Sequence, residues 1–187
     1  MKKLITRFLI AILVLTCLSA CGKVVDTSVT TVPGTSRPSF SMGSYDSRRY
    51  TNDWADLTIR IPDGYRVQPS TIDYSDDCAF YITNDSTGNL TLSFYKSNGY
   101  ETSSAWIDGF FYKFIETRLS DGLNNHEYGT RRVGGYEYRT VDLDYYEDGA
   151  FFACERLYAR AIDNYVVILL IAATSDSELA SLESAIS

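Results

Sequence analysis

The stretch Tyr136–Ala173, YEYRTVDLDYYEDGAFFACERLYARAIDNYVVILLIAA, decides the fold. It contains three runs rich in apolar and aromatic residues, Tyr136–Tyr146, Ala150–Ile162 and Tyr165–Ala173. Short connections that contain Asp, Asn and Gly separate the runs, and such connections join antiparallel neighbours. The stretch therefore predicts a three-stranded antiparallel meander.

The last run of the meander has an unusual pattern. Val166–Ala173 is apolar at both odd and even positions, whereas a half-buried strand alternates. A strand with two apolar faces is covered on both sides. We therefore expect this strand at the centre of the sheet, with further elements packed on each face.

Two segments are predicted to supply helices. Ser103–Leu119 has apolar residues at helical spacing, and Lys113, Glu116 and Arg118 are assigned to the opposite, solvent side. Ser175–Glu178 matches a capping box that opens a closing helix. The apolar face of the first helix consists of Trp106, Ile107, Phe110, Phe111, Phe114, Ile115 and Leu119.

Four shorter strands complete the prediction. Leu57–Ile61 alternates apolar and polar residues, Ala79–Thr83 and Leu90–Tyr95 flank a loop as a hairpin, and Arg131–Val133 precedes a Gly-Gly turn. The predicted fold class is α+β: an antiparallel sheet flanked by helices on both faces, an α/β/α sandwich. The alternative is an antiparallel sheet with helices on one face only.

The N-terminal segment predicts export and lipid attachment. Residues 1–20 combine basic residues, an apolar run too short to span a bilayer, and small residues before a cysteine, as in a signal peptide. Leu18-Ser19-Ala20-Cys21 resembles the bacterial lipobox, which implies a lipid, with palmitate among its acyl chains, on Cys21. Two acyl chains anchor a protein stably.

The segment after Cys21 is predicted to be a tether. Residues 21–49 hold the lipidated cysteine and a stretch rich in Ser and Thr, with Pro and Gly but no apolar periodicity. We expect one globular domain over residues 50–187. The predicted location is the cell membrane, with the domain lipid-anchored and facing outside the cytoplasm in the cell envelope.

Charge and cysteine content limit the function classes. The chain carries a net charge of −7, and its leader holds basic but no acidic residues, so the remainder is more acidic still. This excludes a nucleic-acid partner, which needs basic patches. Cys78 and Cys154 lie in the domain, and an exported protein can oxidise them. A disulfide between them and two free thiols both remain open.

The start of the domain adds a family resemblance. Tyr50-Thr-Asn-Asp53, followed by Ile61-Pro62-Asp63-Gly64-Tyr65, is similar to the strand–Pro–x–Gly–aromatic opening of PsbP-like domains. That superfamily also includes Ran-binding Mog-type proteins and bacterial lipoproteins. The resemblance covers residues 50–187 and implies an α/β/α sandwich with an antiparallel sheet. A shared fold does not fix function.

No motif points to catalysis. His126 is the only histidine, which weakens metal and triad sites. Two acidic clusters, Asp73-Asp76-Asp77 and Asp142–Asp148, lack the spacing of a calcium loop. We therefore expect no metal site, no cofactor and no enzyme activity, but a binding or accessory domain for a protein or cell-envelope partner. The alternative is a small-molecule or cell-wall ligand bound through a tyrosine-rich surface, and a hydrolase is the weakest option. The tyrosines concerned are Tyr136, Tyr138, Tyr145, Tyr146, Tyr158 and Tyr165.

Overall fold

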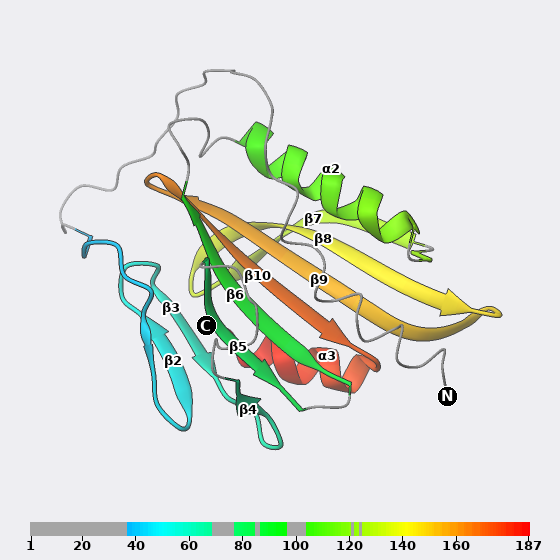
Figure 1. The fold of residues 1–187 in the computed structure, drawn as a ribbon, viewed down its shortest axis with the longest axis horizontal. Coiled ribbons are helices and arrows are strands. Elements are labelled where there is room, and N and C mark those ends of the chain that lie inside the picture. Colours follow the sequence, from blue (N-terminus) through cyan, green and yellow to red (C-terminus); the bar gives the residue numbers. More distant parts are fainter. Residues whose placement is uncertain (1–36, 69–76, 85–86, 97–103, 121, 124) are drawn as a thin grey trace.

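The computed structural model describes residues 37–68, 77–84, 87–96, 104–120, 122–123 and 125–187. The predicted signal peptide, Cys21 and most of the predicted tether lie outside these residues. The described part contains two helices and ten strands in two sheets (Figure 1). Neither helix is long and apolar enough to cross a membrane.

A seven-stranded antiparallel sheet forms the centre of the domain, in the order β4-β5-β6-β10-β9-β8-β7. The predicted meander is confirmed, since β8, β9 and β10 pair consecutively. The strands are β4 (Arg66–Val67), β5 (Cys78–Thr83), β6 (Asn89–Lys96), β7 (Asn125–Val133), β8 (Tyr136–Glu147), β9 (Ala150–Ile162) and β10 (Tyr165–Ala173).

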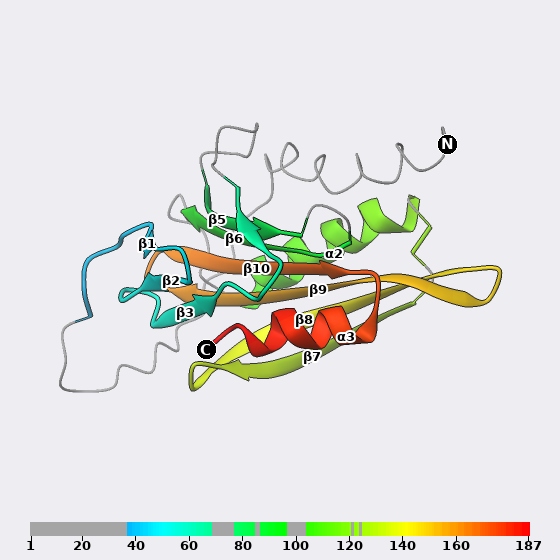
Figure 2. The same cartoon turned by 90° about the horizontal axis from the view of Figure 1, so that it is seen from below.

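The sheet is covered on both faces, as the pattern of β10 requires. Val167, Leu169 and Ile171 belong to one buried cluster, whereas Val166 and Ile168 belong to the other. Helix α2 (Ser104–Ser120) contributes to the second cluster, and α3 (Asp176–Ser184) to the first. Figure 2 shows the two helices on opposite sides of β9 and β10.

A small second sheet shares the α3 side of the domain. It consists of β1 (Ser44–Tyr45), β2 (Arg49–Asn52) and β3 (Leu57–Arg60), and Leu57 and Ile59 are buried in the same cluster as α3. The predicted α+β class and antiparallel sheet are therefore confirmed. The predicted sandwich with helices on both faces is matched only in part, because α3 covers its face together with this small sheet.

The packed domain begins before residue 50. Phe40 stacks on Tyr165 with ring centroids 3.9 Å apart and meets Trp54 edge-on at 5.0 Å. The hydroxyl of Tyr50 donates to the carbonyl of Met42 over 2.7 Å. The described end of the predicted tether is thus held by aromatic contacts that composition alone does not reveal.

The predicted apolar face of α2 packs on the sheet except at its last residue, Leu119. Arg118 was assigned to the solvent side, yet its side chain is only 1% exposed, whereas Leu119 is 55% exposed. Arg118 follows Ile107, Phe111 and Phe114 along the buried stripe of the helix. The Arg118 side chain lies inside because it pairs with the Glu155 carboxylate of the sheet, as described below.

Helix α3 begins as the sequence predicted. The side chain of Ser175 accepts a hydrogen bond from the backbone N–H of Glu178. The Glu178 carboxylate accepts in turn from the backbone of Thr174 at 2.9 Å and from Asn84 and Thr87, each at 2.6 Å. One carboxylate thereby ties the start of α3 to the β5–β6 loop.

Candidate functional site

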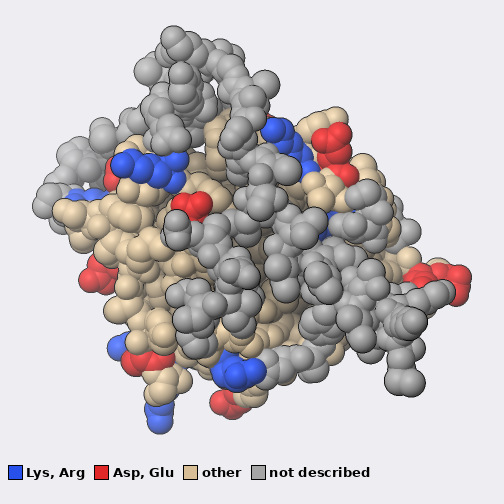
Figure 3. All heavy atoms as spheres, in the orientation of Figure 1, with Lys and Arg blue, Asp and Glu red and all other residues tan. Residues whose placement is uncertain are grey.

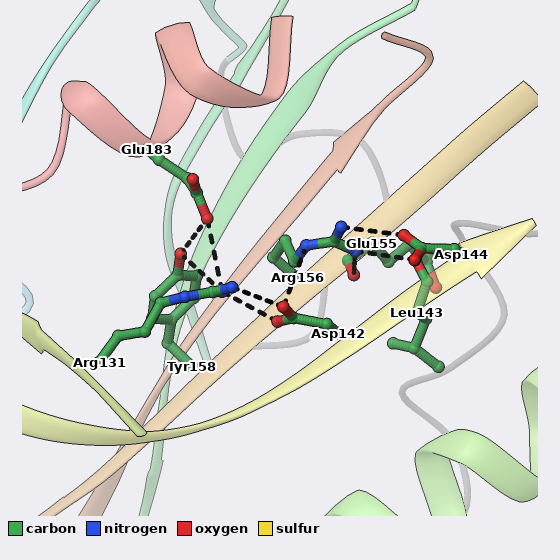
Figure 4. A network of polar contacts seen from close by, with 8 residues as sticks. All are labelled: Arg131, Asp142, Leu143, Asp144, Glu155, Arg156, Tyr158 and Glu183. Atoms are coloured by element: carbon green, nitrogen blue, oxygen red, sulfur yellow. Dashed lines mark hydrogen bonds and ion pairs between the residues drawn. The ribbon is translucent and has the colours of Figure 1, made fainter. Parts of the chain in front are cut away.

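Charged side chains gather on the α3 side of β7, β8 and β9 (Figure 4). Alternation along β8 directs Asp142 and Asp144 to the same face, and the same holds for Arg156 and Tyr158 on β9. Arg131 reaches them from β7 and Glu183 from α3. Asp142 and Asp144, which belong to the second acidic cluster of the sequence, are ion-paired on the strand.

Each arginine of this network forms ion pairs with carboxylates. Arg131 contacts Asp142 at 2.5 Å and Glu183 at 3.5 Å, and Arg156 contacts Asp144 at 2.9 Å. The hydroxyl of Tyr158 donates to Glu183 over 2.6 Å. Burial, together with the charge and hydrogen bond of Glu183, raises the pKa of Tyr158 well above its ordinary value.

The charges of this network compensate one another. Here guanidinium groups hold the carboxylates, and a tyrosine hydroxyl donates to Glu183. The network therefore fastens α3 to the outer strands of the sheet.

A second polar cluster lies under α2. The guanidinium of Arg118 donates to Glu155 through Nε at 2.7 Å and Nη2 at 3.0 Å, and the Tyr145 hydroxyl donates to the same carboxylate at 2.8 Å. Arg118 also lies 4.7 Å from the ring centre of Phe114. These groups satisfy one another inside the apolar core, which marks the cluster as structural.

The predicted tyrosine platform is not assembled. Tyr138 and Tyr158 are buried on the α3 side, and Tyr145 is buried on the α2 side. Tyr165 stacks on Phe40, and Tyr136 and Tyr146 lie at opposite ends of β8. The six tyrosines therefore serve several separate environments and do not share one ligand-binding face.

Other candidate residues of the sequence are also placed. Cys78 and Cys154 are free thiols, and they lie on β5 and β9 with two strands between them. Burial raises the pKa of the Cys154 thiol to about 11. His126 is an exposed residue of β7, 5.9 Å from the ring of Tyr128. Within the described ranges no three His, Cys, Asp or Glu residues come together as a metal site. Asp73 and Asp76 lie outside those ranges.

The structure reveals an apolar surface that the sequence did not predict. Among the described residues few large hydrophobic side chains are more than half exposed, and three of them are Tyr112 (63%), Leu119 (55%) and Tyr128 (51%). We call these three residues the α2–β7 surface. The fourth such side chain, Tyr45, lies on β1 in the small sheet.

The three residues face the same side of the domain. Asp108, Tyr112 and Leu119 lie within about 40° of one another around α2. Asp108 pairs with Arg139 of β8, which fixes this side of the helix toward β8 and β7. Tyr128 projects from β7 on the same face of the sheet, 6.4 Å from the ring of Phe111.

Charge does not mark out another surface in the view of Figure 3. Lys and Arg side chains alternate there with Asp and Glu side chains, and the described atoms between them are mostly uncharged. A large field of one sign would steer charged ligands. On the face shown, charge therefore marks out no ligand site, and the α2–β7 surface is defined by its exposed apolar side chains.

Comparison with known proteins supports the fold. No family model matches the chain, and no curated protein sequence matches it. Among solved structures it is similar to the cyanobacterial PsbP protein (CyanoP) of Synechocystis, with a TM-score of 0.50, 14% identity, and coverage of 80% of this chain and 97% of that one.

Two further solved structures are more distant. The Ran-binding protein Mog1p of Saccharomyces cerevisiae has a TM-score of 0.47 and 10% identity over 77% of this chain and 96% of its own. LpqN of Mycobacterium tuberculosis, described as involved in cell envelope biogenesis, has a TM-score of 0.38 and 16% identity over 69% and 76%. The similarity to cyanobacterial PsbP, together with the observed topology, shows that this chain has the PsbP-like fold.

Proposed function

We propose that this protein is a lipid-anchored component of the bacterial cell envelope whose domain binds a protein partner and has no catalytic role. The observation that carries the proposal is the α2–β7 surface. Contiguous exposed apolar patches mark interaction sites, and we infer that Tyr112, Leu119 and Tyr128 belong to one such patch.

The composition of this surface suits a protein partner. Aromatic residues dominate the binding energy of many interfaces, and fully burying one large apolar side chain contributes about 1.5–3 kcal/mol. Three such side chains on one side could form the central part of an interface. A charged ligand would find no matching counter-charge among Tyr112, Leu119 and Tyr128.

The polar clusters support an accessory role. Arg118 of α2 pairs with Glu155 and Tyr145 of the sheet, and Glu183 of α3 contacts Arg131 and Tyr158 of the sheet. Membrane attachment is supported by the lipobox at Leu18–Cys21. It would hold the domain outside the cytoplasm, where an envelope partner can reach it.

Site-specific photocrosslinking in intact producing cells tests this proposal. A photoreactive phenylalanine analogue replaces Tyr112, and the matched control replaces Tyr45, which is exposed to a similar degree on the small sheet. We expect an adduct with one other protein from position 112 that position 45 does not give. Leu119→Asp should abolish this adduct without changing the expression of the protein.

Two results would overturn the proposal. Equal yields of adduct from positions 112 and 45 would show that the crosslinking is non-specific. An adduct that persists in Leu119→Asp would show that the surface does not carry the binding.

A further inference from the structure

Strand β7 is a long edge of the main sheet. Its nine residues, Asn125–Val133, pair with β8 only, and no strand of the described residues lies on its other side (Figure 2). The opposite edge, β4, has two residues. Edge strands are usually protected by shortness, bulges, proline or charged side chains, and of these β7 has only the charges of Glu127, Arg131 and Arg132. The β7–β8 register runs without a bulge, and β7 contains no proline.

The hairpin turn determines which backbone groups of β7 point outward. Gly134 and Gly135 have φ values of +56° and +84° and form a two-residue turn between Val133 and Tyr136. In such a turn the flanking pair is hydrogen-bonded. Odd-numbered residues of β7 therefore bond to β8, and the backbone of His126, Tyr128, Thr130 and Arg132 faces outward.

We propose that β7 pairs antiparallel with β7 of a second copy of this chain, around a two-fold axis at Gly129. In this register Tyr128 lies opposite Thr130 of the second copy, and His126 lies opposite its Arg132. All nine residues are paired, and about eight new backbone hydrogen bonds form. The interface is isologous, as the symmetry of most dimers requires.

The charges of β7 select this register. Within its own chain Glu127 stands opposite Asp142, and like charges directly opposite each other destabilise a sheet. Asp142 already pairs with Arg131 and Arg156. In the proposed dimer, Glu127 lies opposite Arg131 of the second copy, and symmetry repeats this contact.

Neighbouring registers lose the charge match. An axis at Tyr128 places Glu127 opposite Gly129 of the second copy, and an axis at Thr130 places it opposite Val133. Only the axis at Gly129 also uses the full length of the strand. The inference rests on the backbone and charges of β7 and does not depend on the proposed function, although the dimer would bring two α2–β7 surfaces side by side.

Cysteine crosslinking of the full-length chain in native membranes tests the proposal. Two copies of Gly129 form a non-hydrogen-bonded pair with Cα atoms about 4.5 Å apart, within disulfide range. Gly129→Cys should give a covalent dimer of the chain under mild oxidation. In Asn125→Cys, the matched control, the two cysteines lie about 26 Å apart and should give none.

A charge substitution provides the second arm. In the Gly129→Cys background, Glu127→Arg should lower the dimer yield about tenfold, because it opposes Arg131 of the second copy. The fold should be retained, because Arg at this position faces Asp142 in its own chain. Asp63→Arg makes the same charge change at an exposed turn and should leave the yield unchanged.

Three results would overturn the proposal: no dimer from folded Gly129→Cys, equal dimer from Asn125→Cys, or an equal loss in Asp63→Arg. A Cβ at Gly129 would lie 3.2 Å from the Thr140 hydroxyl, so folding of the reduced variant is checked by thermal unfolding. If that variant does not fold, sedimentation of the unsubstituted chain in detergent decides. A monomeric mass overturns the proposal, and a dimeric mass that Glu127→Arg halves supports it.

Discussion

Replacing Arg118 with Met should lower the free energy of unfolding by about 3–5 kcal/mol, the usual loss when one partner of a buried ion pair is removed. Arg118 is 1% exposed and Glu155 11% exposed at the side chain, and two hydrogen bonds join them. The substitution leaves the Glu155 carboxylate buried with the Tyr145 hydroxyl. The free energy of unfolding of a small domain is about 5–15 kcal/mol, so this loss is readily measured by urea unfolding.

A triple variant distinguishes the cost of an unpaired buried charge from the net contribution of the ion pair. Arg118→Met, Glu155→Leu and Tyr145→Phe combined remove the buried charges and the hydroxyl together, and the triple variant should be within about 2 kcal/mol of the original chain. Arg132→Met, at an exposed arginine of β7, is the matched control and should change stability by less than about 0.5 kcal/mol. The reasoning is refuted if Arg118→Met costs less than about 1 kcal/mol, or if the triple variant is less stable than Arg118→Met.

Four further predictions concern the Glu178 carboxylate, the domain boundary, the cysteines and the lipid anchor. Burial alone would raise the pKa of Glu178, but hydrogen bonds from Thr174, Thr87, Asn84 and Tyr65 outweigh it and hold the pKa below the ordinary 4.5. The ionised Glu178 carboxylate therefore stabilises the fold above pH 4.5, and this stabilisation is lost as the pH falls through its lower folded pKa. Glu178→Gln should reduce the dependence of the free energy of unfolding on pH between about pH 6 and pH 3, measured by urea unfolding. Identical pH profiles of the two chains would contradict this. Phe40→Ala should lower the free energy of unfolding by about 2 kcal/mol through lost aromatic packing, whereas Ser39→Ala should change it very little. Equal effects of the two substitutions would show that residue 40 is not part of the packed domain. Intact-mass measurement without reductant should show Cys78 and Cys154 unlinked, and Cys154 should alkylate slowly until the chain is unfolded, since burial raises the pKa of its thiol to about 11; a mass two hydrogens lower would refute the free thiols. Cys21→Ala should abolish metabolic labelling with radioactive palmitate and release the domain from membranes, and unchanged labelling would exclude the lipobox.

The first six of the nine residues of β7 give no strand signal in the sequence. The sequence predicts only Arg131–Val133 as strand, whereas β7 begins at Asn125. Residues 125–130 are exposed and lack apolar alternation. An edge strand can be held by backbone hydrogen bonds to one neighbour, so its side chains need not show the apolar alternation that predicts a strand.

The candidate surface was missed for a related reason. Helical periodicity placed Leu119 inside and Arg118 outside, since apolar residues are buried more often than charged ones. The structure reverses them because Glu155, 37 residues away, supplies a buried counter-charge. The exposure of Leu119, and with it the α2–β7 surface, depends on that distant partner.

The sequence by itself determined the elements whose signals are local. The β8–β9–β10 meander, the β5–β6 hairpin, α2 and the Ser175 cap follow from alternation, turn residues and capping, which act over a few residues. Tertiary structure decided what depends on contacts between distant residues: the burial of Arg118, the docking of Phe40 on Tyr165, the separation of Cys78 from Cys154 and the dispersal of the tyrosines. Those contacts form only when the sheet brings distant segments together, and a local pattern does not contain them.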